Sequence, residues 1–286
     1  MNNGIRASAD DLEDGEFTNA ATADQEPAGH LPDPKSQNAF AELMKPKPRS
    51  PSREPDRRSE PDRRSAKTTM LGRDGLRQYT ADPESFPQSR VVYYNDKFVV
   101  INDLFPKATV HLLILPRDPN INVLRPQEAF DDPVFLAECQ AEEKKVRELV
   151  ASELRRKLGR YSATEQARLN AMDAEDVPDE LPAGRDWQAG IMSGTHANPS
   201  MNHLHIHVLS KDLHSECMKK RNHYLSFTTE FLIGMEQYPL AKNDPRRHYG
   251  HFPEDMHCWR CGKNFKNKMA RLKEHLEDEF EEWKKE

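Results

Sequence analysis

Three histidines alternate with aliphatic residues in the segment His203-Leu-His-Ile-His-Val-Leu209, and this alternation constrains the fold more than any other feature of the chain. In a β-strand successive side chains point to opposite faces, so the imidazoles would line one face while the aliphatic side chains fill a core. Three imidazoles on an otherwise apolar strand are costly to remove from water unless they serve a purpose. The segment therefore predicts a buried strand that carries a functional site.

Metal binding and catalysis are both compatible with this histidine face. Imidazoles spaced two residues apart are good Zn²⁺ ligands. The preceding segment, His196-Ala-Asn-Pro-Ser-Met-Asn202, adds a fourth histidine, a hydroxyl group and the backbone N–H groups of a turn. A turn of this kind suits a phosphate group better than a metal ion. We therefore favour a catalytic site over metal ligation or a purely structural role.

Apolar segments separated by turn residues accompany the histidine segment. They lie too close together for the crossover helices of a parallel sheet, which favours an antiparallel meander. The stretch 127–158 repeats apolar residues at helical spacing and predicts an amphipathic helix, whereas the polar stretch 159–184 indicates a surface insertion. We expect an α+β body with strands at 90–94, 98–101, 110–115, 190–192 and 204–209, and with helices at 75–81, 127–158 and 267–283.

Residues 1–70 differ in composition from the rest of the chain. Eight prolines fall between Pro27 and Pro61, and aliphatic residues are sparse. Such a segment buries too little apolar surface to offset the entropy lost on ordering, so we predict a disordered arm. It contains a tandem hexapeptide, EPDRRS at 54–59 and again at 60–65, which is typical of a nuclear localisation signal or a nucleic-acid-binding arm. A solvated linker is the alternative, because acidic residues are interspersed.

The composition argues against two broad classes of protein, membrane-inserted and secreted. No apolar run approaches the roughly 18 residues that a membrane-spanning helix requires, so we expect no membrane insertion. The N-terminal residues have neither the apolar core of a secretory signal nor the acid-poor composition of a transit peptide. Four cysteines are too few for a disulfide scaffold and fit a metal site in a reducing compartment better.

A metal site is indicated near the end of the sequence. Cys258 and Cys261 are followed by His275 and then by Glu279. Paired cysteines on a knuckle, with two ligands four residues apart on one helix face, are the arrangement of a ββα zinc finger. We therefore expect a structural Zn²⁺ in a finger at 241–286, after an arm at 1–70 and a catalytic body at 71–240.

The fourth ligand is the least regular part of this pattern, because Glu279 stands where a histidine is usual. Carboxylate oxygen does bind Zn²⁺, and Asp278 and His257 are rival ligands. A reduced cysteine pair without metal is the remaining alternative. The finger is also basic, which argues for contacts to a phosphate backbone, although a finger that only supports the fold is the other interpretation. Its basic residues are Arg260, Lys263, Lys266, Lys268, Arg271 and Lys273.

These motifs together resemble the aprataxin family, which belongs to the histidine-triad (HIT) superfamily of nucleotide hydrolases and transferases. Residues 203–209 match the HxHxHxx motif of the superfamily. The resemblance extends over about 75–286, including Pro106-Lys-Ala-Thr-Val-His111, the segment 196–200, the segment 217–227 and the finger. It implies a HIT-like antiparallel sheet with flanking helices and a small finger of the C2HE type. The lack of an N-terminal FHA-like domain makes the chain similar to the shorter fungal form.

The resemblance also implies roles for individual residues. His205 would attack the α-phosphorus of an adenylate and form a covalent nucleotidyl-histidine, which water then hydrolyses. His203 and His207 would orient the ring and contact phosphate oxygens, and His196 would donate a proton to the leaving group. The nucleotide would be held by Asp103, Lys107, His111, Ser200, Lys219 and His223.

The implied activity is removal of AMP from the 5′-phosphate of DNA, or of RNA–DNA junctions, after abortive ligation. The same chemistry would remove a 5′-linked GMP. DNA contacts would come from Arg77, Tyr79 and Phe86 at the first helix, where either aromatic residue is equally suited to the core, and from Lys266, Lys268 and Arg271 in the finger. The expected location is the nucleus, with the cytoplasm as a second compartment. Two alternatives remain: a HIT hydrolase of small nucleotides, such as dinucleoside polyphosphates or nucleoside phosphoramidates, and a non-catalytic nucleic-acid-binding module.

Overall fold

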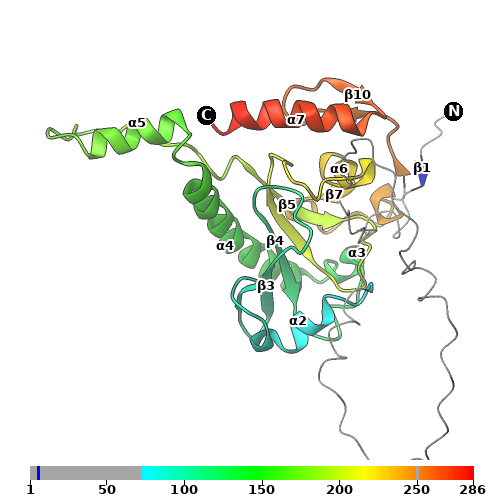
Figure 1. Cartoon of the computed structure of the whole chain (residues 1–286). Helices are drawn as coiled ribbons and strands as arrows, with labels where there is room; N and C mark the ends of the chain where they lie inside the picture. The colour runs from blue at the N-terminus through cyan, green and yellow to red at the C-terminus, as the bar shows by residue number, and fades with distance from the viewer. Residues whose placement is uncertain (1–4, 7–71, 249–250) are drawn as a thin grey trace, which may run out of the picture. The chain divides into compact units, whose positions relative to one another are not determined.

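The computed structural model describes residues 5–6, 72–248 and 251–286 (Figure 1). The predicted disordered arm and its hexapeptide repeat therefore lie outside the described residues, apart from β1 (Ile5–Arg6), which pairs antiparallel with β8 (His251–Phe252). Among the described residues, no helix combines the length and the apolar character needed to cross a bilayer.

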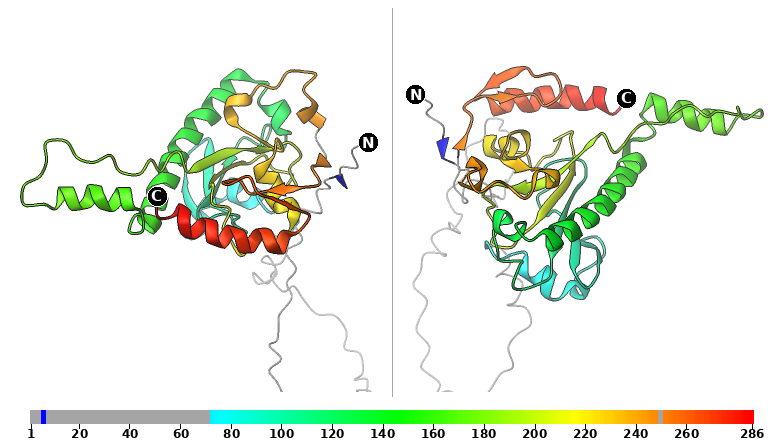
Figure 2. Two further views of the ribbon diagram at one scale, coloured as in Figure 1. Left: turned by 90° about the horizontal axis from the view of Figure 1, so that it is seen from above. Right: turned by 180° about the vertical axis from the view of Figure 1, so that it is seen from behind.

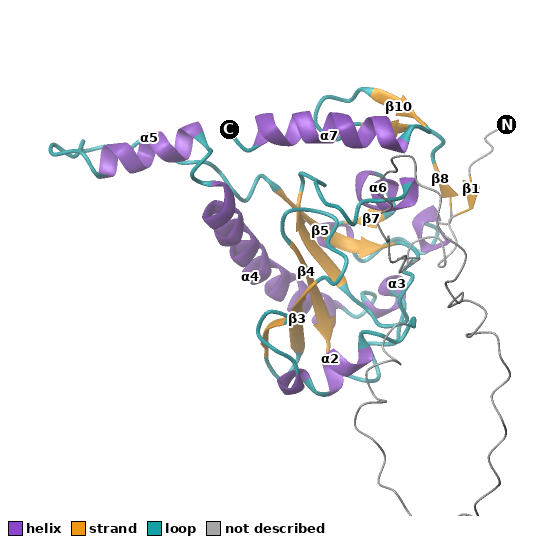
Figure 3. Cartoon of the chain, viewed as in Figure 1, coloured by secondary structure: helices purple, strands orange, loops and turns teal. Residues whose placement is uncertain are grey.

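A six-stranded antiparallel sheet, in the order β2-β3-β4-β6-β5-β7, forms the centre of the fold, which confirms the predicted class (Figure 3). Alternate side chains of the central strands enter two separate cores: Val100 and Ile114 face one, and Val99 and Leu113 face the other. The runs 99–101 in β3 and 112–115 in β4 are therefore entirely apolar, because both faces of the sheet are covered here. The strands are β2 (Val91–Tyr94), β3 (Phe98–Asn102), β4 (His111–Pro116), β5 (Ile191–His196), β6 (Ile206–Ser210) and β7 (Leu232–Ile233).

One face of the sheet is covered by α4 (Pro133–Leu158), which packs across β4, β5 and β6 (Figures 1 and 2). The single helix predicted over 127–158 is in fact two, α3 (Pro126–Ala129) and α4. Asp132 caps the new helix by accepting hydrogen bonds from the backbone of Val134 and Phe135, and Pro133 occupies its first turn, where no N–H is needed.

The other face is covered by α2 (Arg77–Ala81), the short helix expected at 75–81. The predicted surface insertion at 159–184 contains a helix of its own, α5 (Ala163–Met172), which Ser162 caps. It is anchored to the finger, because the N–H of Ala163 donates to the carbonyl of Lys285.

The C-terminal part consists of a hairpin and a helix that continue the core of the sheet. Leu272, Leu276 and Trp283 belong to the same buried cluster as the side chains between α4 and the sheet. The remaining elements are α6 (Arg221–Thr228), β9 (Met256–His257), β10 (Asn264–Lys266), α7 (Met269–Trp283) and the 3₁₀ turns η4 (Pro83–Ser85), η5 (Met235–Gln237) and η6 (Pro245–His248).

Candidate active site and metal centre

The histidines converge where β5 and β6 meet. The rings of His196 and His207 have centroids 4.4 Å apart, and those of His205 and His207 are 4.9 Å apart. The expectation that 203, 205 and 207 lie on one strand face is wrong for the first two, because β6 begins only at Ile206. Burial lowers the pKa of His203, and the charges of Asp74, just before α2, and of Arg77, its first residue, act on this pKa in opposite directions.

His205 is held in one tautomer. Its Nδ1 lies 2.7 Å from the carbonyl oxygen of His203, and because a carbonyl can only accept, Nδ1 carries the proton. Burial lowers the pKa of His205, which keeps the ring neutral. A neutral imidazole with its proton on Nδ1 has its lone pair on Nε2, the form that a nucleophile requires.

His196 ends β5 in an apolar enclosure. Its ring packs against Phe227 and Phe231, with centroids 4.9 and 5.2 Å away. Burial lowers the pKa of His196 well below its ordinary value, and the nearby His205 adds to this effect. A phosphate bound beside the ring would favour its protonated form, since an opposite charge raises the pKa of an imidazole.

Phe227 is a residue of this site that the sequence analysis did not assign. From α6 it presents its ring to three histidines, with centroids 5.6 Å from His111, 4.9 Å from His196 and 5.2 Å from His207. Its position one helical turn after His223 places both residues on the same face of α6, which is the signal that could have identified it.

Two of the predicted nucleotide-binding residues, His111 and Asp103, join the cluster directly. His111 is buried, and its Nε2 lies 2.9 Å from Nδ1 of His207 and 3.5 Å from Oδ2 of Asp103. Burial lowers the pKa of His111 to about 4, although Asp103 acts in the opposite direction. The Lys107 side chain turns to the carbonyl oxygen of Phe105, 2.5 Å away.

The other predicted nucleotide-binding residues lie on the segments around the cluster. Ser200 is buried in the segment between β5 and β6. His223 is buried in the first turn of α6, and its Nδ1 accepts from the backbone N–H of Lys219 at 3.3 Å. The side chain of Lys219 is exposed.

The three residues predicted to contact DNA at the first helix are not all at the surface. Tyr79 is buried, its hydroxyl accepts a hydrogen bond from Arg90 at 2.8 Å, and its ring lies 4.4 Å from that of Phe86. The predicted DNA contact of Tyr79 is therefore wrong in this structure, because the ring fills the core under α2, which was the alternative given for it. Arg77 is exposed and Phe86 is partly exposed.

The four predicted metal ligands come together in the finger. One ligand atom from each of Cys258, Cys261, His275 and Glu279 lies within 4.8 Å of the others. Nε2 of His275 is 3.1 Å from both Sγ of Cys261 and Oε1 of Glu279. Two thiolates, an imidazole and a carboxylate form a donor set that fits tetrahedral Zn²⁺. The rivals Asp278 and His257 are exposed and stand outside this group.

Arg260 is one of the basic residues of the finger, but its guanidinium is paired with the Glu279 carboxylate. It donates to Oε2 of Glu279 at 2.6 Å and to Glu286 at 2.6 Å. The hydrogen bond from Arg260 holds the pKa of Glu279 below its usual value, so the carboxylate is ionised. The side chains of Lys266, Lys268 and Arg271 are exposed.

Tyr224 joins the finger to the histidine cluster. This fully buried residue of α6 donates to the carbonyl of His257 and accepts from the N–H of Trp259, both at 2.9 Å. These partners flank Cys258, and Phe227 on the same helix lies against the histidines. A single helix therefore contacts both groups.

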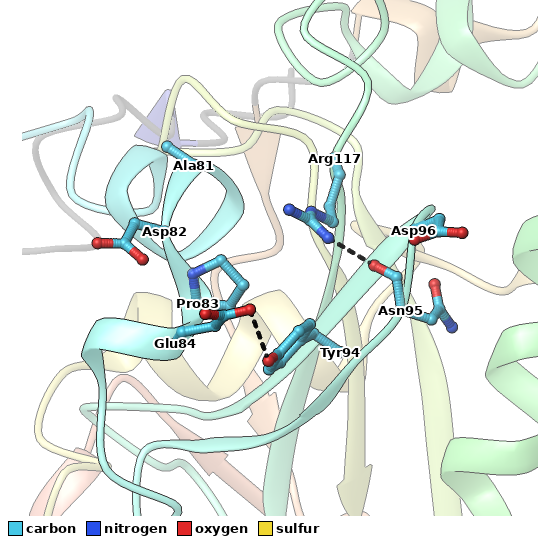
Figure 4. Close-up of a pocket in the computed structure, with 8 residues that line it drawn as sticks. All are labelled: Ala81, Asp82, Pro83, Glu84, Tyr94, Asn95, Asp96 and Arg117. Atoms are coloured by element: carbon cyan, nitrogen blue, oxygen red, sulfur yellow. Dashed lines mark hydrogen bonds between the residues drawn. The ribbon is translucent and has the colours of Figure 1, made fainter.

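A surface hollow of about 390 Å³ lies elsewhere, between η4 and the turn that joins β2 to β3 (Figure 4). Arg117 donates to the carbonyl of Asn95 at 2.8 Å, and Tyr94 donates to Glu84 at 3.1 Å. None of its lining residues is a histidine or a cysteine, so it offers no group comparable to those of the cluster.

Comparison of the sequence with protein families matches both regions. Residues 86–214 match the HIT domain, and residues 228–282 match the C2HE / C2H2 / C2HC zinc-binding finger. An aprataxin-like protein of Schizosaccharomyces pombe is 33% identical over 213 residues, which cover 74% of this chain and 82% of the relative. An aprataxin-like protein of Saccharomyces cerevisiae is 34% identical over 220 residues, covering 74% and 97%.

Solved structures give the same result. The crystal structure of the aprataxin ortholog Hnt3 from Schizosaccharomyces pombe superposes with a TM-score of 0.59 at 31% identity, covering 75% of this chain and 95% of that one. A structure described as Hnt3 in complex with DNA and guanosine has a TM-score of 0.57 at 31% identity, covering 74% and 96%.

Proposed function

Because the chain belongs to the aprataxin-like proteins of the HIT family, we propose that it is a hydrolase that removes AMP from 5′-phosphate ends of DNA. The observation that carries the proposal is the state of His205, a neutral ring with its lone pair on Nε2, beside His196 and His207. The DNA and guanosine described for Hnt3 support the substrate class.

In the proposed reaction, Nε2 of His205 attacks the α-phosphorus of the adenylate. A P–N bond forms and the bond from phosphorus to the bridging oxygen breaks, so the DNA leaves with a 5′-phosphate. Protonated His196 donates its proton to the leaving oxygen. Neutral His196 then takes a proton from water, which attacks the phosphorus, releases AMP and restores the free imidazole. A 5′-linked GMP would react in the same way.

The finger is proposed to hold a structural Zn²⁺ and to contact DNA. Its four donors fit the ion, which would supply folding free energy to a unit of this size. Its exposed residues Lys266, Lys268 and Arg271 would contact phosphates without reading sequence. On the body, Arg77 and Phe86 would lie beside the DNA end.

We propose that the protein acts in the nucleus, because abortive ligation would leave its adenylated ends on nuclear DNA. Imaging of the tagged full-length chain, and of a variant in which residues 54–65 are replaced by Gly and Ser, tests this location. Loss of nuclear signal only in the variant would support a role for the hexapeptide repeat in import. Exclusion of the unaltered protein from the nucleus would contradict the proposed location.

The decisive experiment compares nicked DNA that carries a 5′-adenylate with diadenosine polyphosphate. We expect the adenylated DNA to be the better substrate by kcat/KM, with AMP and a ligatable 5′-phosphate as products. A strong preference for the dinucleotide would identify a hydrolase of small nucleotides instead. Binding of DNA with no turnover of either compound would identify a non-catalytic module.

A further inference from the structure

A series of hydrogen bonds leads from the backbone of Lys107 through two histidine rings to the centre of the cluster. The N–H of Lys107 donates to Nδ1 of His111 at 3.1 Å, and Nε2 of His111 lies 2.9 Å from Nδ1 of His207. The rings come from the paired strands β4 and β6, where Leu113 stands opposite His207 and His111 lies two residues earlier. Side chains in such diagonal positions share one face of the sheet and are within reach of each other.

The first donor fixes the direction of the whole series. A neutral imidazole has one nitrogen that donates and one that accepts, and a backbone N–H can only donate. Burial lowers the pKa of both His111 and His207, so both rings are neutral. His111 therefore accepts at Nδ1 and carries its proton on Nε2. Both acceptors near that nitrogen, His207 at 2.9 Å and Asp103 at 3.5 Å, require this same tautomer.

This direction also decides the protonation of Nε2, the second ring nitrogen of His207. Its Nδ1 accepts from His111, so its proton is on Nε2. Within the described part of the chain, this nitrogen is buried and has no hydrogen-bond partner. The ring stands 4.4 Å from that of His196 and 4.9 Å from that of His205. A buried N–H without a partner is costly, and a phosphoryl oxygen bound at His205 would satisfy it.

We propose that His111 is a positioning residue that holds His207 as its Nε2–H tautomer, so that this N–H stabilises the charge on the phosphoryl group under attack. This proposal rests on the proposed function, and it replaces the direct phosphate contact that the resemblance implied for His111. The backbone of Lys107 acts through His111 in the same way.

Two substitutions of His111 separate hydrogen bonding from packing. His111→Gln retains one acceptor and one donor, whereas His111→Phe retains a ring of similar size that can neither accept nor donate. We expect His111→Phe to lower kcat about 10²-fold with little change in KM, which is the usual effect of removing one fixed donor to the transition state. His111→Gln should retain kcat within about tenfold of the wild type. Equal kcat for His111→Phe and wild type would overturn the proposal.

A second measurement needs no substrate and therefore stands apart from the proposed reaction. Nitrogen NMR of the full chain with ¹⁵N-labelled histidine reports which ring nitrogen carries the proton, and His207→Gln assigns the signal. We expect wild-type His207 to be protonated at Nε2, with a shift toward the Nδ1–H form in His111→Phe. Wild-type His207 protonated at Nδ1 would overturn the proposal even where neither His111 variant folds. Inactivity on adenylated DNA with the expected tautomer would count against the proposed function alone.

Discussion

The histidine cluster and the metal-ligand group of the finger each gather four side chains, but in opposite surroundings. In the cluster His111, His196, His205 and His207 are all at least 93% buried, and burial lowers the pKa of each. Of the four ligands in the finger only Cys258 is buried, while Arg260 keeps Glu279 ionised. Desolvation produces neutral rings that can act as nucleophiles, whereas exposure preserves the charges that bind a metal ion and attract phosphates.

The largest expected effect tests the buried side of this comparison. His205→Ala removes the proposed nucleophile, and turnover of adenylated DNA should fall at least about 10⁴-fold, because no second group replaces a covalent catalyst. The substitution only shortens a side chain, so the far-ultraviolet circular dichroism spectrum and zinc content should be unchanged. AMP bound covalently to the wild-type protein after acid-free quenching should be absent from the variant. Substantial turnover by the variant would show that another residue attacks phosphorus.

The next effect concerns the proton that His196 is proposed to supply. His196→Ala should slow the reaction about 10²–10⁴-fold when the leaving group is a poor one, such as the DNA 5′-phosphate. A substrate with a leaving group that needs no proton, such as a p-nitrophenyl ester of AMP, should be affected far less. An equal loss on both substrates would indicate that His196 only shapes the site.

A smaller effect is expected from the exposed charges of the finger. Reversing Lys266, Lys268 and Arg271 to Glu should weaken DNA binding about 10- to 100-fold, and the slope of log affinity against log salt should fall by about 0.9 for every phosphate that is no longer neutralised. Zinc content and hydrolysis of diadenosine polyphosphate should not change. The three reversals are also made one at a time, and Lys144→Glu, which reverses an exposed lysine on α4, is the charge-matched control for each of them. An unchanged salt slope would show that DNA binds elsewhere.

The smallest effect tests whether the two regions are independent. Tyr224→Phe removes a hydroxyl that satisfies the carbonyl of His257 and the N–H of Trp259, at a cost of about 1–3 kcal/mol. We expect weaker zinc retention against a chelator and a kcat on diadenosine polyphosphate that is a few-fold lower, because α6 also carries Phe227.

Tyr93→Phe is the matched control for this variant, since it removes a hydrogen bond to Glu142 far from the finger. If both variants behave alike, Tyr224 provides no coupling between the regions. Cys258→Ser should then disturb the finger alone, as expected for two units that fold separately.

Local patterns predicted those features that depend on spacing along the chain. Alternation placed Ile206 and Val208 in a core, and the spacing from Cys258 to Glu279 selected the residues that now lie within 4.8 Å. The hydrogen bond between His111 and His207 could not be predicted in this way, because the two residues are 96 positions apart and meet only through the pairing of β4 with β6. Tyr79 shows the same limit, since the composition of a five-residue helix does not decide which face is buried.

Tyr224 also imposes an order on the synthesis of the protein. Its two hydrogen-bond partners lie about thirty residues further along, so they leave the ribosome after the whole catalytic sheet has been made. Until then the hydroxyl lacks both partners, and the helix that bears Phe227 lacks its support. The helix that presents Phe227 to the histidines therefore gains its last two hydrogen bonds only when the β9–β10 hairpin has been made.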